Sequence, residues 1–337
     1  MTQTFTDLGR VAAIRQLFEG TGYDPFGEPL SFEAKPQECI VTASGLLLEG
    51  IDFDLVYFPF RHLGRKAVLR VAGELYAAMA DPENLSVQLG ISAKLDFPQV
   101  QELWQGLAAT AREYGFRQLS LDLQPSRNGL TIALSATGRH SAAVSAARPK
   151  AQSKDLICVS GALGAAFLGL QVLERERARF DRGGSDPKRL EQYKMLVGAY
   201  LRPEIDPRTV RQLVSSGIAP SQGCFVTRGL ADALLRLSRA SGLGAKVYAD
   251  KIPFEGGSFA LGKELDLDPV SAAMNGGEDF QLLYTVPLAQ YELFRKDFQS
   301  FDIIGHLAQP EAGVVLVSPD GLEHRVSAPG WDPAAED

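Results

Sequence analysis

The sequence has few of the residues that build metal or disulfide frameworks. Only three of its 337 residues are cysteine and four are histidine. Cys39, Cys158 and Cys224 are widely separated, odd in number and without paired spacing, and the histidines are equally scattered. This distribution argues against a zinc site and against a disulfide framework.

Excess positive charge and long apolar runs are also missing. The net charge of -7 argues against a general nucleic-acid binder, because a phosphate backbone requires a basic face. No uncharged apolar stretch is long enough to span a membrane, and the first twenty residues carry too many charges for a signal peptide. The composition, 45% hydrophobic and 22% charged, is that of an ordinary globular protein. We therefore expect a cytoplasmic protein without nucleic-acid or membrane partners.

The length is sufficient for two domains. In the first part of the chain, apolar periodicity predicts strands at 38–42, 86–91, 118–123 and 130–137, and helices at 62–79 and 97–114. The helix at 97–114 has the clearest periodicity, and Pro98 suits its first turn.

Residues 139–154 are mostly small or basic and without periodicity, which predicts a domain boundary between 1–145 and 146–337. Beyond it we expect strands at 155–160, 223–226 and 245–249, helices at 163–177, 190–200 and 229–241, and a loop at 180–188. A hairpin is predicted at 313–326, with its turn at Pro319-Asp320-Gly321. The fold class is therefore α+β with two domains.

One motif stands out: Asn275-Gly276-Gly277-Glu278-Asp279, followed by an apolar strand. Two glycines allow a backbone to approach a ligand closely, and two carboxylates follow them. By itself the motif also fits a polar turn that leads into a strand.

Together with other segments, this motif resembles thiamine-monophosphate kinase, in the aminoimidazole ribonucleotide synthetase superfamily. The segments occur in family order at 46–53, 62–68, 155–166, 275–283, 304–306 and 330–332. The resemblance implies an ATP-binding-like N-terminal domain, 1–145, whose sheet dimerises into a shared β-barrel, and a C-terminal α+β domain, 146–337. It also implies ATP-dependent phosphorylation of thiamine monophosphate to thiamine diphosphate, with magnesium ions held between carboxylates and phosphates.

Most acidic positions that the resemblance implies are replaced in this chain. An early Gly-Asp-Asp is absent, 33–38 standing in its place, and a Thr-Thr-Asp is Ala43-Ser44-Gly45. An Asp-Ile-Ser-Asp-Gly motif is Phe225-Val226-Thr227-Arg228-Gly229, so a cation replaces a carboxylate. Asp122 is kept, and one further carboxylate survives only as the longer Glu74. Two carboxylates do not make a multi-magnesium site, and Arg228 would repel a divalent ion.

We therefore interpret the chain as a kinase-like protein that has lost catalysis and retains a binding or regulatory role, without a required cofactor. The alternative is an active kinase that uses Mg²⁺ and ATP at a reduced metal site. Expected partners are a second copy of the chain in a homodimer, a nucleotide or thiamine phosphate, or a catalytically complete paralogue.

The candidate residues follow from the resemblance and from charge. For phosphate or nucleotide binding we expect Lys66, Arg228 and Asp122, the last also being the best catalytic candidate, and for residual metal binding Glu74 and Asp122. The candidate substrate-binding residues are Asp52, Asn275, Gly276, Gly277, Glu278, Asp279 and Trp331. Structural alternatives stay open: a solvated helix start for Arg228, a helix-surface lysine for Lys66, a capped turn for Glu278 and Asp279, and surface packing for Trp331.

Overall fold

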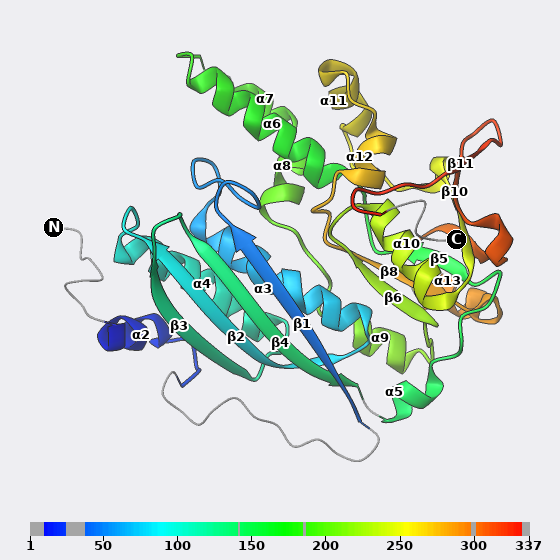
Figure 1. Ribbon diagram of the computed structural model, residues 1–337, viewed down its shortest axis with the longest axis horizontal. Helices are drawn as coiled ribbons and strands as arrows, with labels where there is room; N and C mark the ends of the chain where they lie inside the picture. The colour runs from blue at the N-terminus through cyan, green and yellow to red at the C-terminus, as the bar shows by residue number, and fades with distance from the viewer. Residues whose placement is uncertain (1–9, 25–37, 141, 185–186, 298–300, 332–337) are drawn as a thin grey trace. The chain divides into compact units, whose positions relative to one another are not determined.

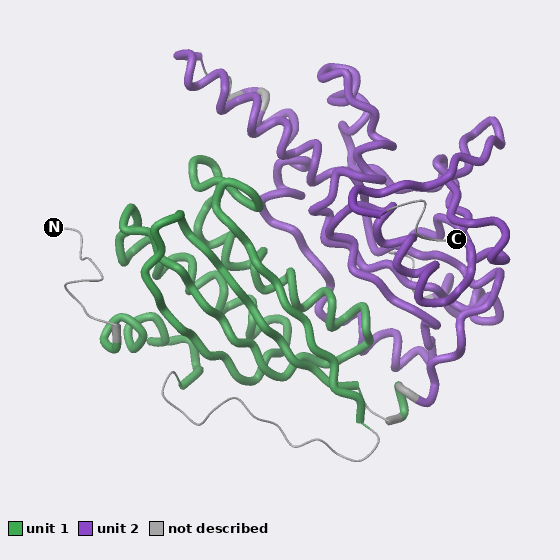
Figure 2. The backbone as a smooth tube through the Cα atoms, in the orientation of Figure 1, with its two compact units in different colours: residues 1–145 green, residues 146–337 purple. Residues whose placement is uncertain are grey.

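The fold is described from a computed structural model that covers residues 10–24, 38–140, 142–184, 187–297 and 301–331 (Figure 1). The chain separates into two compact units, Met1–Ser145 and Ala146–Asp337 (Figure 2). No helix of the described part is both long enough and apolar enough to cross a membrane.

Unit 1 contains a four-stranded sheet in the order β1-β4-β2-β3. Its strands are β1 (Cys39–Leu48), β2 (Asp81–Ser92), β3 (Gln118–Ser126) and β4 (Thr131–His140). β4 pairs antiparallel with β1 and with β2, whereas β3 runs parallel to β2. The strand predicted at 38–42 is longer than expected because β1 pairs with β4 along its whole length, as far as Leu48.

Helices α3 (Phe60–Ala77) and α4 (Phe97–Glu113) cover one face of this sheet (Figure 1). Leu85, Val87 and Leu89 of β2 are buried on that face, as the alternation of a half-buried strand requires. The two helices pack closely because Gly64 and Gly106 lie where they meet. A Cβ on Gly64 would lie 2.2 Å from the carbonyl oxygen of Leu103. The short helix α2 (Arg10–Phe18) adds Phe18 against the Trp104 ring, 4.9 Å between centroids.

The other face of the same sheet is mostly polar, apart from Ile40 and Leu46 of β1, and carries no helix in the described part of unit 1. The register brings Ser86 of β2 beside Ser120 of β3, and Gln88 beside Asp122. Ser120 Oγ donates a hydrogen bond to Ser86 Oγ at 3.1 Å. In one chain the four strands thus form an open sheet with one apolar and one polar face.

Unit 2 contains a seven-stranded mixed sheet in the order β11-β10-β7-β9-β5-β8-β6. Its strands are β5 (Leu156–Val159), β6 (Gln222–Val226), β7 (Gly244–Tyr248), β8 (Gln281–Val286), β9 (Asp302–Ala308), β10 (Val314–Val317) and β11 (Glu323–Arg325). Its helices are α5 (Ala142–Ala147), which includes the last residues of unit 1, α6 (Ala165–Phe180), α7 (Pro187–Gln192), α8 (Lys194–Leu201), α9 (Thr209–Ser215), α10 (Leu230–Ser241), α11 (Ser258–Leu265), α12 (Pro269–Asn275) and α13 (Tyr291–Asp297). The main core packs α10 against this sheet, with Leu234 buried beside Val159 and Ile304.

The predicted mixed α+β class is confirmed, and several elements differ in detail. The helix expected at 97–114 forms, with Asp96 and Gln99 making a capping box at its start. The hairpin of β10 and β11 also forms. The single helix expected at 190–200 is wrong: α7 and α8 are separate, with Tyr193 buried between them and its hydroxyl bonded to Glu264 at 2.7 Å. Residues 139–154, where we predicted a domain boundary from the lack of apolar periodicity, contain the end of β4 and helix α5.

Candidate functional site

Three loops of unit 2 meet at one edge of the seven-stranded sheet. They are 160–164 after β5, 227–229 after β6 and 275–280 before β8. Because β8 runs antiparallel to both β5 and β6, its first residue lies at the edge where those two strands end. Backbone bonds hold the loops together: Glu278 N–H donates to Thr227 O at 2.9 Å, and Phe280 N–H to Val226 O at 3.0 Å.

The glycines of this edge allow the close approach of its loops. Gly229 has a φ of +91°, and a Cβ there would lie 2.3 Å from the Met274 carbonyl oxygen. Gly277 has a φ of +77°. Glu278 and Phe280 also adopt left-handed backbone conformations, at +65° and +54°, which side chains other than glycine rarely do. The predicted turn before β8 is therefore a tight, locally strained segment.

Asp279 is buried at this edge and caps helix α6. Its carboxylate accepts hydrogen bonds from the backbone N–H of Gly164, at 2.8 Å, and of Ala166, at 3.2 Å. Burial raises the pKa of Asp279 to about 7; the two N–H bonds oppose this rise and the neighbouring Glu278 adds to it. The carboxylate thus satisfies orphan N–H groups of α6 and complements the positive end of the helix dipole.

Helix α10 begins at the same edge in a different way. Gly229 precedes it and provides no side-chain cap. Thr227 is buried, whereas Arg228 is exposed and has no hydrogen bond or ion pair within the described part of the chain. Asn275 is likewise exposed and Gly276 half-buried. Of the predicted candidates, Arg228 and 275–279 therefore lie on loops that touch one another.

Trp331 lies against the start of α10. Its indole N–H donates to Asp232 Oδ1 at 2.9 Å, and its ring packs on the main core of unit 2. Asp232 also pairs with Arg236 at 2.8 Å. The sequence analysis did not single out Asp232; its position three residues after the capping Gly229 is the signal that was present. The neighbouring Asp332 and the segment 33–37 lie outside the described residues.

Two candidates of unit 1 serve the turn that follows β1. Asp52 Oδ2 accepts from the backbone N–H of Leu48 at 2.7 Å. Lys66 is fully buried, donates from Nζ to the Asp52 carbonyl at 3.4 Å and lies 5.1 Å from the centroid of the Phe58 ring. Lys66 is therefore a buried cation that supports this turn, and neither a helix-surface lysine nor one that extends into solvent.

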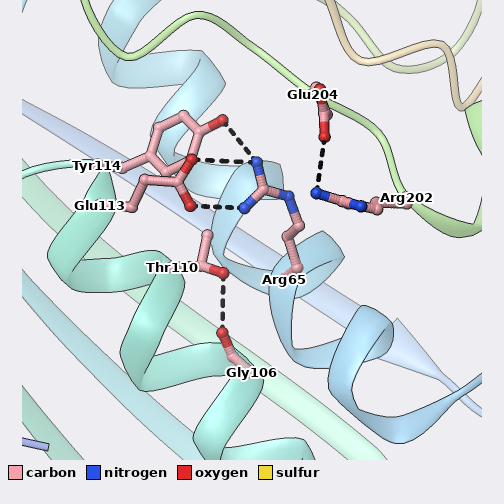
Figure 3. Close-up of polar contacts among 7 residues, drawn as sticks. All are labelled: Arg65, Gly106, Thr110, Glu113, Tyr114, Arg202 and Glu204. Carbon is pink, nitrogen blue, oxygen red and sulfur yellow. Dashed lines mark hydrogen bonds and ion pairs between the residues drawn. The ribbon is translucent and has the colours of Figure 1, made fainter.

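The segment 62–68 also carries Arg65, which the sequence analysis did not single out. Its guanidinium binds both carboxylate oxygens of Glu113, at 2.6 and 3.3 Å, and the Tyr114 hydroxyl at 3.3 Å (Figure 3). This bidentate pair joins α3 to the end of α4. The basic side chains of the segment thus have structural partners.

The two residual metal candidates lie on different sides of the four-stranded sheet. The register places Asp122 on the polar face, beside Gln88. Glu74 belongs to α3, the helix that covers the opposite face. Within the described residues, no group of three or more His, Cys, Asp or Glu side chains is arranged to hold a metal ion. The described residues of one chain therefore do not gather the oxygen ligands that several magnesium ions need.

The comparisons with known proteins agree with the resemblance. No family model matches the chain. A thiamine-monophosphate kinase of Pyrococcus horikoshii is 24% identical over 95% of this chain and 94% of its own length. A thiamine-monophosphate kinase of Synechococcus elongatus is 28% identical over 72% of this chain and 71% of its own. The chain is thus similar in sequence to thiamine-monophosphate kinases over most of its length.

Solved structures show the same fold. Thiamine monophosphate kinase of Aquifex aeolicus superposes with a TM-score of 0.69 at 21% identity, covering 96% of this chain and all of that one. The hydrogenase maturation protein HypE of E. coli superposes with a TM-score of 0.71 at 17% identity, covering 94% and 97%. A further match, with a TM-score of 0.68 at 21% identity over 96% and 97%, is AaThiL complexed with AMPPCP and TMP.

Proposed function

We propose that this protein is a thiamine-monophosphate-kinase-like protein that binds ATP or a thiamine phosphate and has lost phosphoryl transfer. The observation that carries the proposal is the sequence Thr227-Arg228-Gly229 before α10. Arg228 is exposed there beside the loop 275–280 and has no acidic partner in the described part of the chain. A guanidinium at this position repels a divalent cation and attracts an anionic group.

The acidic residues of unit 2 support this assignment. Asp279 already serves α6 through two backbone hydrogen bonds, so a metal ion at its carboxylate would compete with those buried N–H groups for the same oxygens. In our proposal Arg228 binds a phosphate directly. Asn275 and the loop 276–278 lie beside the same ligand.

The test is a calorimetric titration with ATP, with its non-hydrolysable analogue AMPPCP and with thiamine monophosphate, each with and without Mg²⁺. The ATP samples that contain thiamine monophosphate are then analysed for thiamine diphosphate. We expect binding whose affinity is independent of Mg²⁺, and no product. Magnesium-dependent binding with thiamine diphosphate formed would contradict the proposal.

The second candidate is an active, magnesium-dependent thiamine-monophosphate kinase, which the activity named for its relatives favours. Glu74, Asp122, Glu278 and Asp279 would supply its reduced metal site. Under this alternative, Asp122→Asn abolishes the formation of thiamine diphosphate. Under the first proposal the wild-type protein forms none, so the product assay alone separates the two.

We further infer that unit 1 forms a homodimer through the face of its four-stranded sheet that carries no helix. The strands of the two sheets together then close a shared barrel. β1 is an edge strand, and Ile40 and Leu46 are 46% and 53% exposed along it. Exposed apolar side chains on a long edge strand favour pairing with another chain. Light scattering after size-exclusion chromatography should give a dimer for the wild type and a monomer for Leu46→Asp. A monomeric wild type would contradict this inference.

A further inference from the structure

The seven-stranded sheet has a cavity on the face opposite α10. Ile157 of β5 and Val247 of β7 belong to the core under α10, so their strand neighbours Leu156 and Tyr248 point to the other face. A cavity of about 360 Å³ opens there, within the size range of small-molecule sites. The residues that matter among those lining it are Lys154, Leu156, Tyr248, Lys251, Ile303 and His306. The three loops of the candidate site do not contribute to this lining.

The cavity is basic in an acidic protein. The chain carries a net charge of -7, yet none of the described residues that line the cavity is acidic. Lys154 and Lys251 are exposed, and neither has a carboxylate partner among the described residues. Lys251 Nζ lies 4.9 Å from the centroid of the Tyr248 ring, a cation–π contact. Two lysines without acidic partners in one cavity favour an anion.

His306 lies in the same cavity and adds a hydrogen-bond donor. Burial, together with repulsion from Lys246 and Lys251, lowers the pKa of His306, so its ring is neutral at pH 7. A neutral imidazole keeps one N–H to donate. The His306 and Tyr248 rings lie 6.0 Å apart between centroids, with 32° between their planes. The cavity thus combines cations and a neutral donor with aromatic surface.

Lys154 is held in place by an unusual backbone. Its φ of +78° lies in the left-handed region, where glycine or asparagine is the usual residue. Its N–H donates to the Leu307 carbonyl at 2.7 Å, which fixes the start of the lysine side chain at the rim of the cavity. A strained lysine at this position is consistent with a binding role.

From this arrangement we propose that the cavity binds a small phosphate monoester that carries a planar ring. The phosphate pairs with Lys154 and Lys251 and accepts a hydrogen bond from His306. The ring lies on Tyr248, with Leu156 and Ile303 forming the apolar wall. This site is separate from the one at Arg228 and does not depend on the proposed function.

The test uses phenyl phosphate as the probe and the full chain as the receptor, with calorimetry as the readout. We expect saturable binding to the wild type, weakened about tenfold in the double variant Lys154→Ala, Lys251→Ala. The matched control is Lys263→Ala, an exposed lysine on α11 of the same unit, which should bind within about twofold of the wild type. All three variant positions are exposed, so thermal unfolding should be unchanged and verifies that each protein is folded.

Two further comparisons make the test specific. Phenyl phosphate should bind about threefold or more tightly than inorganic phosphate, because only the ester places a ring on Tyr248; equal affinity would overturn the planar-ring part of the proposal. Because Arg228 is itself proposed to bind phosphate at the other site, the titration is repeated in Arg228→Ala, where the double lysine substitution should still weaken binding of phenyl phosphate about tenfold. Non-saturable binding, or loss of binding in Arg228→Ala but not in the double lysine variant, would overturn the site altogether.

Discussion

Two helices of unit 2 begin at the same edge of one sheet, and the backbone N–H groups of their first turns find different partners. The start of α6 binds a carboxylate of its own chain, Asp279, which lies more than a hundred residues away in sequence. The start of α10 follows Gly229 without a side-chain cap and carries the exposed cation Arg228 beside it. Both N-termini favour negative charge. At α6 the protein supplies that charge through the distant Asp279. At α10 it supplies Asp232 in the first turn, and we propose that an anionic ligand binds at Arg228 beside it.

The largest expected effect comes from removing the Asp279 carboxylate that caps the start of α6. Asp279→Ala removes the acceptor for the Gly164 and Ala166 N–H groups inside the protein, so we expect a loss of about 3 kcal/mol in the free energy of unfolding. Urea denaturation measures it. The matched control is Asp268→Ala, which removes the solvent-exposed N-cap of α12 and should cost about 1 kcal/mol. Equal losses at both positions would argue against the special role of buried Asp279.

The same carboxylate should make stability depend on pH. Its pKa in the folded protein is about 7, against the ordinary value of 3.8 for an aspartate, so the folded state binds the proton more tightly than the unfolded chain. The stabilisation from this protonation is complete below about pH 4 and is lost as pH rises through 7. The stability of the wild type relative to Asp279→Asn should therefore fall by about 2 kcal/mol between pH 5 and 7.5. A constant difference in urea denaturation across this range would contradict the raised pKa.

The start of α10, where Arg228 is exposed, is tested by measuring ligand affinity. Arg228→Ala should weaken binding of AMPPCP or thiamine monophosphate about tenfold, because one charge-assisted contact to phosphate is lost. It should leave unfolding unchanged, since Arg228 has no partner in the described part of the chain. Arg239→Ala, at the other end of α10 and also exposed, is the matched control for overall charge. Equal weakening in both variants would assign the effect to net charge alone.

The smallest effect concerns the residue docked on α10. Trp331→Phe removes the hydrogen bond to Asp232 while retaining an aromatic ring, so we expect a loss of about 1 kcal/mol in unfolding free energy. Affinity for thiamine monophosphate should change by less than about twofold. A large loss of affinity at unchanged stability would instead give Trp331 a role in stacking on the thiamine ring.

Local sequence signals predicted the elements whose stability is local. The helix α4 was predicted because its apolar periodicity and the proline of its first turn lie within the segment itself. The hairpin of β10 and β11 was predicted from its turn residues. In contrast, β9 was not predicted as a strand. It pairs with β5 and β7, and Gly305 interrupts its apolar pattern, so its pairing depends on segments distant in the chain.

In the candidate site, too, some features were predicted from the local sequence and others depend on the fold. The sequence identified the loop 275–280 and the cation at Arg228, since residue types and order carry that information. From the sequence, the Asp279 carboxylate could either bind a ligand or belong to a capped turn. Only the fold reveals that its carboxylate reaches the Gly164 and Ala166 N–H groups. Likewise, the face on which Asp122 lies follows from strand register, and the position of Glu74 follows from the side of the sheet that α3 covers. No residue-by-residue pattern specifies either.

By itself, the sequence determined the mixed α+β class and the resemblance to thiamine-monophosphate kinases, and it placed Phe225 and Arg228 where that resemblance implies carboxylates. These features depend only on local order and composition. The tertiary structure decided which polar groups are already used and which are free. Asp279 and Lys66 are buried with partners, whereas Arg228 is exposed. Burial and hydrogen bonding arise between segments that meet only when the chain folds, so these assignments required the structure.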